Sequence, residues 1–298
     1  MAASLLVDAR CILGEGIIWD PQRRLLLWTD IESAALWVYG GIAAPTRTWA
    51  VPHRLGSFAL CDSGRLLLGL AKGLFIAEFD GVADTALAVT ILVPVEPELP
   101  STRINDGRTD RNGNFVFGTC NMNDDRAPLG SFYQYSTRHG LRRLPLDSVS
   151  IANSICFSLD GGTMYFCDSP KRRIMQCRYD ADSAEVSQVR LFAEFGARQG
   201  LPDGSVIDAA GCLWNAEWGA GMVRRYTPAG AIDREIVVPA KNPTCVAFGG
   251  GSLQDLYITS ARQEMTPEEL ARTPHAGGVY RASVGDVRGQ PDSMFLDG

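Results

Sequence analysis

The chain repeats one pattern six times, and this repetition limits its fold more than any other feature. Each copy has a polar residue, an apolar stretch of strand length, a short turn and a second apolar stretch. The copies begin at Gly14, Gly56, Asn105, Asn153, Pro202 and Pro243. A further pair of short strand-like segments usually follows, so one unit contains about four strands. Four short strands that recur every roughly 40–50 residues are typical of a β-propeller blade.

The repeats therefore predict an all-β fold, a six-bladed β-propeller with four-stranded antiparallel blades. Six such units account for residues 1–298, so a single domain is expected. Residues 4–8 are apolar enough to add a strand to the last blade and so remove an exposed sheet edge. Only TPEELAR, from Thr266, is typical of a short helix, with a Thr cap and early acidic residues. A generic β-sandwich is the alternative, although sandwiches do not repeat a four-stranded unit this regularly.

Composition and charge exclude several classes of partner. The chain has 28 Lys and Arg against 34 Asp and Glu, a net charge of −6, and no basic run, whereas phosphate binding depends on clustered basic residues. No apolar run approaches the roughly 18–20 residues that cross a bilayer, and the chain begins without the basic leader of a secretory signal. The eight cysteines form no C-x-x-C pair and are expected to be reduced thiols. We therefore expect a cytoplasmic protein, monomeric or weakly homo-oligomeric, that binds neither nucleic acid nor membrane.

Oxygen-bearing side chains stand at the start of four of the six repeats. Glu15, Asn105 and Asp203 lie eight residues before the start of the second strand of their copy, and Asn153 lies nine before. In a propeller the innermost strands begin near the axis, so these four side chains are expected to converge at one mouth of the channel. Two carboxylates and two amide oxygens, without His or Cys, suit a divalent cation such as Ca²⁺, Mg²⁺ or Mn²⁺. The alternative is that they shape turns, because N-D-G and P-D-G are good turn sequences.

Other catalytic arrangements have little support in the sequence. His53, His139 and His275 form neither H-x-H nor H-E-x-x-H, so they do not indicate a His-ligated zinc site. The chain contains no G-x-S-x-G nucleophile elbow. No G-x-G-x-x-G follows a predicted strand, so a dinucleotide site is not indicated.

Several longer motifs, in this order along the chain, resemble the gluconolactonase/regucalcin (senescence marker protein) family. They are L-G-E-G-x-x-W-D from Leu13, S-T-R-I-N-D-G-R-x-D-x-x-G-x-F-x-x-G-T from Ser101, I-A-N-S from Ile151, L-P-D-G from Leu201 and T-S-A-R…A-G-G-V-Y from Thr259. The likeness runs from about residue 6 to the carboxyl terminus. It implies a six-bladed propeller of the metal-dependent sugar lactonases, which agrees with the repeats.

The resemblance also implies a metal site. Glu15, Asn153 and Asp203 would be the ligands of one divalent cation, and Asp203 would also carry the proton during hydrolysis. The cation could be Ca²⁺, Mn²⁺, Mg²⁺, Zn²⁺ or Fe²⁺. Asp106 is expected to orient Asn105 or to shape the turn rather than to react.

Substrate contacts are implied at Arg103 and Asn105, and at Asn121 and Asn123. Where the family often carries an acidic residue after its G-T-M segment, this chain has amides at positions 121 and 123. The sugar is therefore expected to differ rather than the reaction, with L-arabinono-, D-xylono- and D-gluconolactone as candidate substrates. Two alternatives are a non-catalytic calcium-binding or regulatory propeller and a related phosphotriesterase or aryl-esterase.

Overall fold

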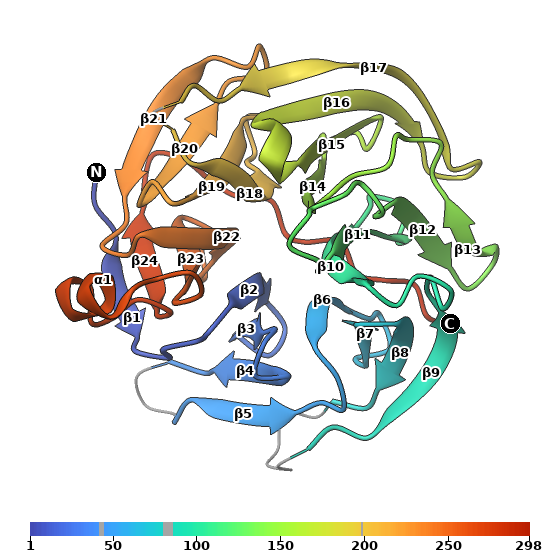
Figure 1. Ribbon diagram of the computed structural model, residues 1–298, viewed down its shortest axis with the longest axis horizontal. Helices are drawn as coiled ribbons and strands as arrows, with labels where there is room; N and C mark the ends of the chain where they lie inside the picture. The colour runs from blue at the N-terminus through green and yellow to red at the C-terminus, as the bar shows by residue number, and fades with distance from the viewer. Residues whose placement is uncertain (42–44, 80–85, 198) are drawn as a thin grey trace. The chain divides into compact units, whose positions relative to one another are not determined.

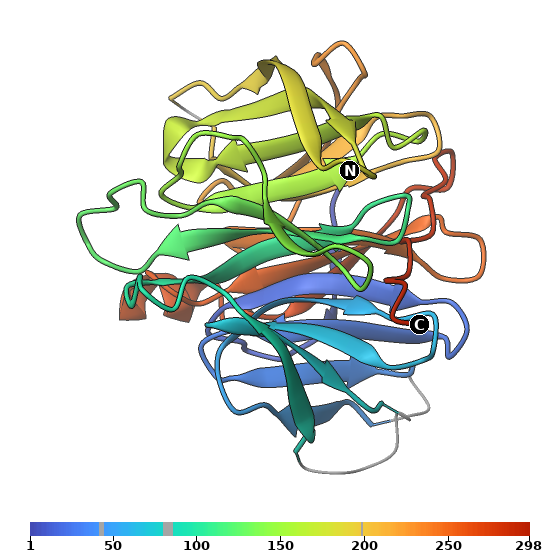
Figure 2. The ribbon, with the colours of Figure 1, turned by 90° about the vertical axis from the view of Figure 1, so that its right-hand side faces the viewer.

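Six four-stranded antiparallel sheets make up the structure, a computed structural model that describes residues 1–41, 45–79, 86–197 and 199–298 (Figures 1 and 2). This is the six-bladed β-propeller predicted from the repeats, with one sheet as each blade. Five sheets follow chain order, namely β2-β3-β4-β5, β6-β7-β8-β9, β10-β11-β12-β13, β14-β15-β16-β17 and β18-β19-β20-β21, and the sixth has the order β1-β24-β23-β22.

The strands are short. Their bounds are β1 Ser4–Val7, β2 Gly14–Asp20, β3 Leu25–Asp30, β4 Ala35–Tyr39, β5 Arg47–Ala50, β6 Leu55–Leu60, β7 Leu66–Leu70, β8 Gly73–Ala77, β9 Val89–Pro94, β10 Thr102–Thr109, β11 Phe115–Asn121, β12 Phe132–Ser136, β13 Gly140–Arg143, β14 Ala152–Phe157, β15 Thr163–Asp168, β16 Arg173–Asp180, β17 Glu185–Glu194, β18 Leu201–Ile207, β19 Leu213–Trp218, β20 Met222–Tyr226, β21 Ile232–Val237, β22 Asn242–Gly249, β23 Asp255–Ala261 and β24 Val279–Ser283.

The described chain divides into two compact units. Unit 1 comprises Met1–Thr48 and Phe195–Pro291, and unit 2 comprises Trp49–Glu194 and Asp292–Gly298. Each has its own apolar core: Trp214, Ile236 and Tyr280 lie in one cluster of unit 1, and Phe115 and Phe295 lie in one cluster of unit 2. The single domain expected from the repeats stays a prediction.

The sixth sheet is completed by the beginning of the chain, as predicted. β1 pairs antiparallel with β24, with Ser4 opposite Arg281 and Leu5 opposite Tyr280. In unit 2 the last residues of the chain have a comparable role, because Phe295 bridges to Cys61 beside β6 and Leu296 donates its N–H to the carbonyl of Gly113 before β11 (Figure 1). Both chain ends therefore satisfy backbone groups of the sheets.

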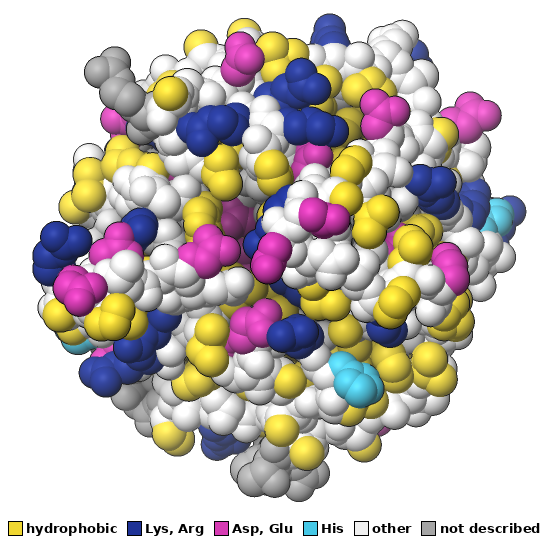
Figure 3. Space-filling model, in the orientation of Figure 1, with side chains coloured by type: hydrophobic (Ala, Val, Ile, Leu, Met, Phe, Trp, Pro, Cys, Tyr) yellow, Lys and Arg dark blue, Asp and Glu magenta, His cyan; other side chains and the backbone are white. Residues whose placement is uncertain are grey.

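Helix is confined to short segments. α1 (Pro267–Arg272) has the predicted Thr266 cap, with the Thr266 side chain accepting from the Glu269 N–H and the Glu269 side chain accepting from the Thr266 N–H. A 3₁₀ turn, η1 (Ser169–Lys171), follows β15. No helix in the described residues is both long and apolar enough to cross a membrane. Basic and acidic side chains are interspersed on the face drawn in Figure 3. Glu269 of α1 forms an ion pair with Lys241 at 2.6 Å.

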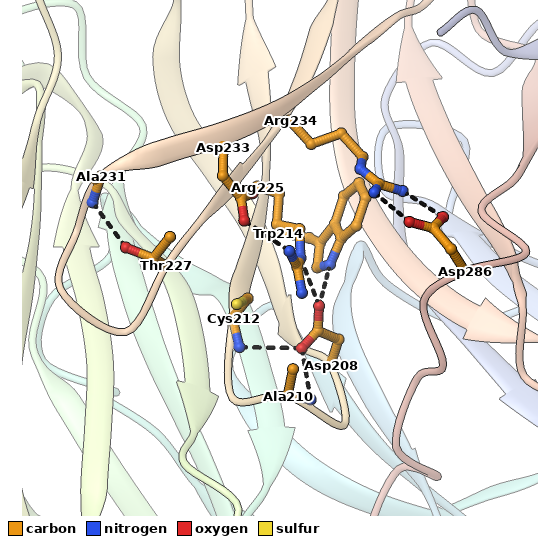
Figure 4. Close-up of polar contacts among 10 residues, drawn as sticks. All are labelled: Asp208, Ala210, Cys212, Trp214, Arg225, Thr227, Ala231, Asp233, Arg234 and Asp286. Atoms are coloured by element: carbon orange, nitrogen blue, oxygen red, sulfur yellow. Dashed lines mark hydrogen bonds and ion pairs between the residues drawn. The ribbon is translucent and has the colours of Figure 1, made fainter.

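Five of the six copies have an Asp at their first turn, and three of these, Asp20, Asp110 and Asp208, are buried. Asp208 follows β18, and its Oδ1 accepts from the N–H groups of Ala210 and Cys212 at 2.9 and 3.0 Å (Figure 4). Its Oδ2 accepts from Trp214 Nε1 at 2.9 Å and Arg225 Nε at 2.7 Å. One carboxylate thus closes the hairpin and joins it to the next two strands, a structural role that agrees with its recurrence in the repeats.

The eight cysteines are all buried and free of disulfide bonds, as predicted. Desolvation raises the pKa of the Cys11 thiol to about 12, and it does the same for Cys156 and Cys177. These thiols are therefore neutral packing groups rather than nucleophiles.

Candidate functional site

Each of the six innermost strands carries a bulge at a corresponding place. The pairing with the second strand shifts between Glu15 and Ile18, Leu55 and Ser57, Ile104 and Gly107, Asn153 and Cys156, Pro202 and Ser205, and Pro243 and Val246. Bulges re-aim side chains and are over-represented beside active sites. The four oxygen-bearing residues selected by their spacing all lie at such bulges.

The strand registers divide these four residues between two neighbouring positions. Glu15 and Asn153 are each the last paired residue before the bulge. Asn105 and Asp203 are each the first residue inside it. The spacing along the sequence, counted back from the second strand, predicts one level for all four residues. The structure differs because a count of residues does not show where a bulge begins.

The N-D-G and P-D-G sequences do not form turns. Asn105-Asp106-Gly107 lies inside β10 and Pro202-Asp203-Gly204 lies inside β18. Gly204 is instead required by a close approach, because a Cβ there would lie 2.6 Å from the Sγ and 2.8 Å from the Cα of Cys245 in β22. Glycine thus lets two innermost strands of unit 1 pack against each other.

In unit 2, three predicted site residues form one buried hydrogen-bonded chain. Arg103 donates from Nη1 to Asn105 Oδ1 at 2.7 Å and to the carbonyl of Ile104 at 2.9 Å. Asn105 donates from Nδ2 to Asn153 Oδ1 at 3.0 Å and to the carbonyl of Ala152 at 2.9 Å. The side chains of this hydrogen-bonded series are held away from bulk water, because Arg103, Asn105 and Asn153 are 8, 9 and 6% exposed. The structure therefore brings together Arg103, Asn105 and Asn153, three of the residues selected from the sequence.

In unit 1, Glu15 and Asp203 occupy bulges of β2 and β18. The carboxylate of Glu15 is half-buried and its Oε2 accepts from the N–H of Gly16 at 3.1 Å. Asp203 is buried, and its backbone carbonyl accepts from Nδ2 of Asn215 on β19 at 2.8 Å. Asn215 also donates to the hydroxyl of Ser205 at 2.9 Å. This amide fixes the shape of the bulge that carries Asp203, a role that spacing along the sequence did not reveal.

Asn121 and Asn123 differ in what their side chains do. Asn121 is fully buried, donates to Asp125 Oδ1 and to the carbonyl of Ala127, both at 3.0 Å, and accepts from the N–H of Asn123 at 3.0 Å. Its amide therefore shapes the loop after β11. Asn123 is exposed on that loop. The amide of Asn121 is thus used within its own loop, and the substrate contact at Asn123 stays a prediction.

Asp106 shapes the bulge of a strand and not the turn that was expected from its sequence. Its Oδ1 accepts from the N–H of Gly107 at 2.9 Å, and its Oδ2 accepts from the N–H of Ile155 in β14 at 2.8 Å. Desolvation raises the pKa of the Asp106 carboxyl, and the N–H of Ile155 and the charge of Arg108 oppose that shift. Asp106 thus joins the β10 bulge to the β14 bulge, beside Asn105 and Asn153.

The chemistry of the predicted metal ligands fits a divalent cation. Among the residues that the structure describes, no group of three or more His, Cys, Asp and Glu side chains could hold a metal ion. The predicted set contains two carboxylates, Glu15 and Asp203, and one amide. Asn153 donates its Nδ2 to Ser169 Oγ at 2.9 Å, so Oδ1 is the end of the amide left for a ligand. Asn105 uses one acceptor position of that oxygen and leaves a second. Oxygen donors of this kind are those that Ca²⁺ and Mg²⁺ prefer.

Comparison with known proteins agrees with the fold and with the family that the motifs resemble. Residues 13–262 match the family described as SMP-30/Gluconolactonase/LRE-like region. The chain is 46% identical over 287 residues to L-arabinolactonase of Azospirillum brasilense, covering 95% of this chain and 92% of that protein. It is 33% identical to 6-deoxy-6-sulfogluconolactonase of Pseudomonas putida, covering 95% of each. A crystal structure of regucalcin from Agrobacterium tumefaciens, described as a calcium-binding protein, superposes with a TM-score of 0.90 at 30% identity, covering 99% of this chain and 97% of that one.

The fold and these relatives define the class of protein as an enzyme of the sugar-lactonase type. The chain belongs to the SMP-30/Gluconolactonase/LRE-like family, as its motifs predicted.

Proposed function

We propose that this lactonase hydrolyses aldonolactones to aldonic acids with the help of one divalent cation. L-Arabinono-lactone is the first candidate substrate, because the relative with 46% identity is named an L-arabinolactonase. D-Xylono- and D-gluconolactone are the other two. The observation that carries the proposal is the buried hydrogen-bonded chain of Arg103, Asn105 and Asn153, which holds polar donors and an amide oxygen at neighbouring bulges.

The cation would be bound by Glu15, Asn153 and Asp203. Their support as one set is the family resemblance, together with their places at or directly before the bulges of β2, β14 and β18. When bound, a divalent cation would polarise the lactone carbonyl and stabilise negative charge on its oxygen. Ca²⁺, Mn²⁺, Mg²⁺, Zn²⁺ and Fe²⁺ are the candidates.

The other steps belong to side chains of the chain itself. Asp203 would take a proton from the attacking water and return one to the ring oxygen as the C–O bond breaks. Within the described residues, both hydrogen bonds of Arg103 leave from Nη1, so Nε and Nη2 are assigned to hydroxyls of the sugar. Asn105 holds Arg103 in place, and Asn123 would contact the sugar from its loop.

A lactone panel assayed against a metal series tests the proposal. Protein stripped with a chelator should lose activity, and one of the five cations should restore it. Hydroxylated lactones should be opened with higher kcat/KM than δ-valerolactone, because a site built to hydrogen-bond hydroxyls leaves polar groups unpaired when they are missing. Equal activity on δ-valerolactone would instead favour the broader esterase class.

A calcium-binding protein without lactonase activity is the second candidate, because the regucalcin structure is described as calcium-binding. The same panel separates the two. Calcium binding measured by calorimetry, together with no hydrolysis of any lactone under any cation, would favour that candidate.

A further inference from the structure

The end of β15 holds the beginning of β14 at several points. Asp168, the last residue of β15, accepts from the N–H groups of Ser150 and Ile151, both at 3.0 Å. Ser169 then donates its backbone N–H to the carbonyl of Ile151 at 3.0 Å. Its hydroxyl accepts from Asn153 Nδ2 at 2.9 Å. The same two residues thus fix both the backbone before Asn153 and the side chain of Asn153.

The backbone around Ser169 is itself well fixed. Ser169 is 5% exposed and begins η1, with Pro170 as the second residue. Arg172 closes the turn in the left-handed region, at φ 54°, and donates its N–H to the carbonyl of Ser169. The proline limits φ within this turn, so the backbone that carries Ser169 has little freedom to move away from Asn153.

The hydrogen-bonded chain has a direction that its first member determines. An arginine can only donate, so the amide of Asn105 must turn its oxygen toward Arg103 and its nitrogen toward Asn153. Asn153 must then turn its oxygen toward Asn105 and its nitrogen toward Ser169. The hydroxyl of Ser169 can donate or accept at one and the same oxygen, and toward Asn153 it accepts.

We propose that Ser169 is a positioning residue, which completes the chain Arg103–Asn105–Asn153–Ser169 and so holds the amide of Asn153 with its oxygen toward the cation. This inference rests on the proposed role of Asn153 as a metal ligand. Residues that orient a ligand commonly change metal affinity by about 10–100-fold when they are replaced. Ser169 itself neither binds the cation nor contacts the substrate.

The test compares Ser169→Ala with Ser131→Ala. Ser131 is equally buried, at 5% exposed, and its hydroxyl also accepts one hydrogen bond, from Arg143 Nε at 3.1 Å. Two quantities are measured: the hydrogen-exchange rate of the Asn153 side-chain NH₂ in metal-free protein by NMR, and the Kd for Ca²⁺ and Mn²⁺ by calorimetry. Ser169→Thr keeps the hydroxyl and serves as the conservative variant.

We expect Ser169→Ala to speed exchange of the Asn153 NH₂ and to raise the metal Kd about 10–100-fold, with Ser131→Ala and Ser169→Thr close to wild type. Unchanged exchange and Kd in Ser169→Ala would overturn the proposal. So would an equal loss of affinity in Ser131→Ala, since that would show a general effect on stability. If Ser169→Ala does not fold, the NH₂ exchange rate and the metal Kd of Ser169→Thr test the proposal instead. A loss of metal affinity in Ser169→Thr as large as that of a variant without the Asn153 amide would refute the role of Ser169. A wild type that binds no cation would refute the proposed metal site, while the exchange rates would still test whether Ser169 orients Asn153.

Discussion

Replacement of Arg103 by methionine tests the substrate role of this site most directly. Methionine keeps much of the side-chain length and removes every donor. The lost bond from a charged donor to a sugar hydroxyl should cost about 1.5–3 kcal/mol of transition-state stabilisation. That corresponds to a roughly 10- to 150-fold fall in kcat/KM, at about 1.4 kcal/mol per decade. Arg103→Lys should recover only part of this, because one ammonium group cannot reproduce the planar set of donors.

The same substitution also has a structural cost, which the assay must separate. Asn105 Oδ1 and the carbonyl of Ile104 would each lose a donor, at about 1–3 kcal/mol for a buried acceptor left unpaired. Arg111→Met is the matched control in unit 2, because Arg111 donates to the backbone carbonyls of Phe157 and Ser158 away from the site. Urea unfolding of both variants measures the structural part.

The comparison of substrates decides the outcome. Steady-state kinetics on L-arabinono-lactone and on δ-valerolactone should show a large fall for the first substrate and a small one for the second in Arg103→Met. Unchanged kcat/KM on the hydroxylated lactone, or an equal fall on both substrates, would refute the assignment of Arg103 to sugar hydroxyls.

Three further predictions concern other parts of the chain. Asp203→Asn keeps the shape of the side chain but removes its charge, so kcat should fall about 10²–10⁴-fold and calorimetry should show weaker metal binding; full activity would contradict its role. Gly204→Ala should lower the free energy of unfolding by about 1–3 kcal/mol in urea, because the new Cβ meets the backbone of Cys245, and an unchanged midpoint would contradict this. Hydrogen bonds from Arg234 lower the pKa of Asp286 to about 2, so its stabilisation is complete above the unfolded pKa near 3.8 and is lost as the pH falls through 2. Asp286→Asn should therefore lose less stability than wild type between pH 5 and pH 2, and equal losses would show that this pair does not contribute.

The fold could be predicted because the sequence features that define the repeat act between residues close together in the chain. Each copy alternates apolar strands with turns, and residues such as Asp208 close their hairpins through contacts within a few positions. The cap at Thr266 is similarly local, and the helix after it was predicted correctly. Even the strand formed by residues 4–8 followed from apolar character and the need to cover an edge.

The predicted site is more dependent on contacts between distant residues, and there the spacing was less informative. N-D-G and P-D-G have the composition of turns, yet they lie inside strands because the bulge and the neighbouring strand determine the backbone. Gly204 shows the reason. Glycine is needed there because Cys245 of another strand packs against it, and not because its own φ is positive.

The direction of an amide is the property of this site that a sequence is least able to show. The sequence shows that Asn105 and Asn153, 48 residues apart, each have one amide oxygen and one amide nitrogen. It does not show which way either amide points. Which of the two atoms faces a ligand is decided by Arg103, acting through Asn105. Ser169 holds the nitrogen end of Asn153 in that direction, and it lies 16 residues beyond Asn153 in a turn without any motif. Motifs such as I-A-N-S therefore indicate a candidate ligand, whereas the donors and acceptors around it determine whether its oxygen is presented. Substitutions at Ser169 should consequently alter metal affinity in a chain whose motifs are all intact.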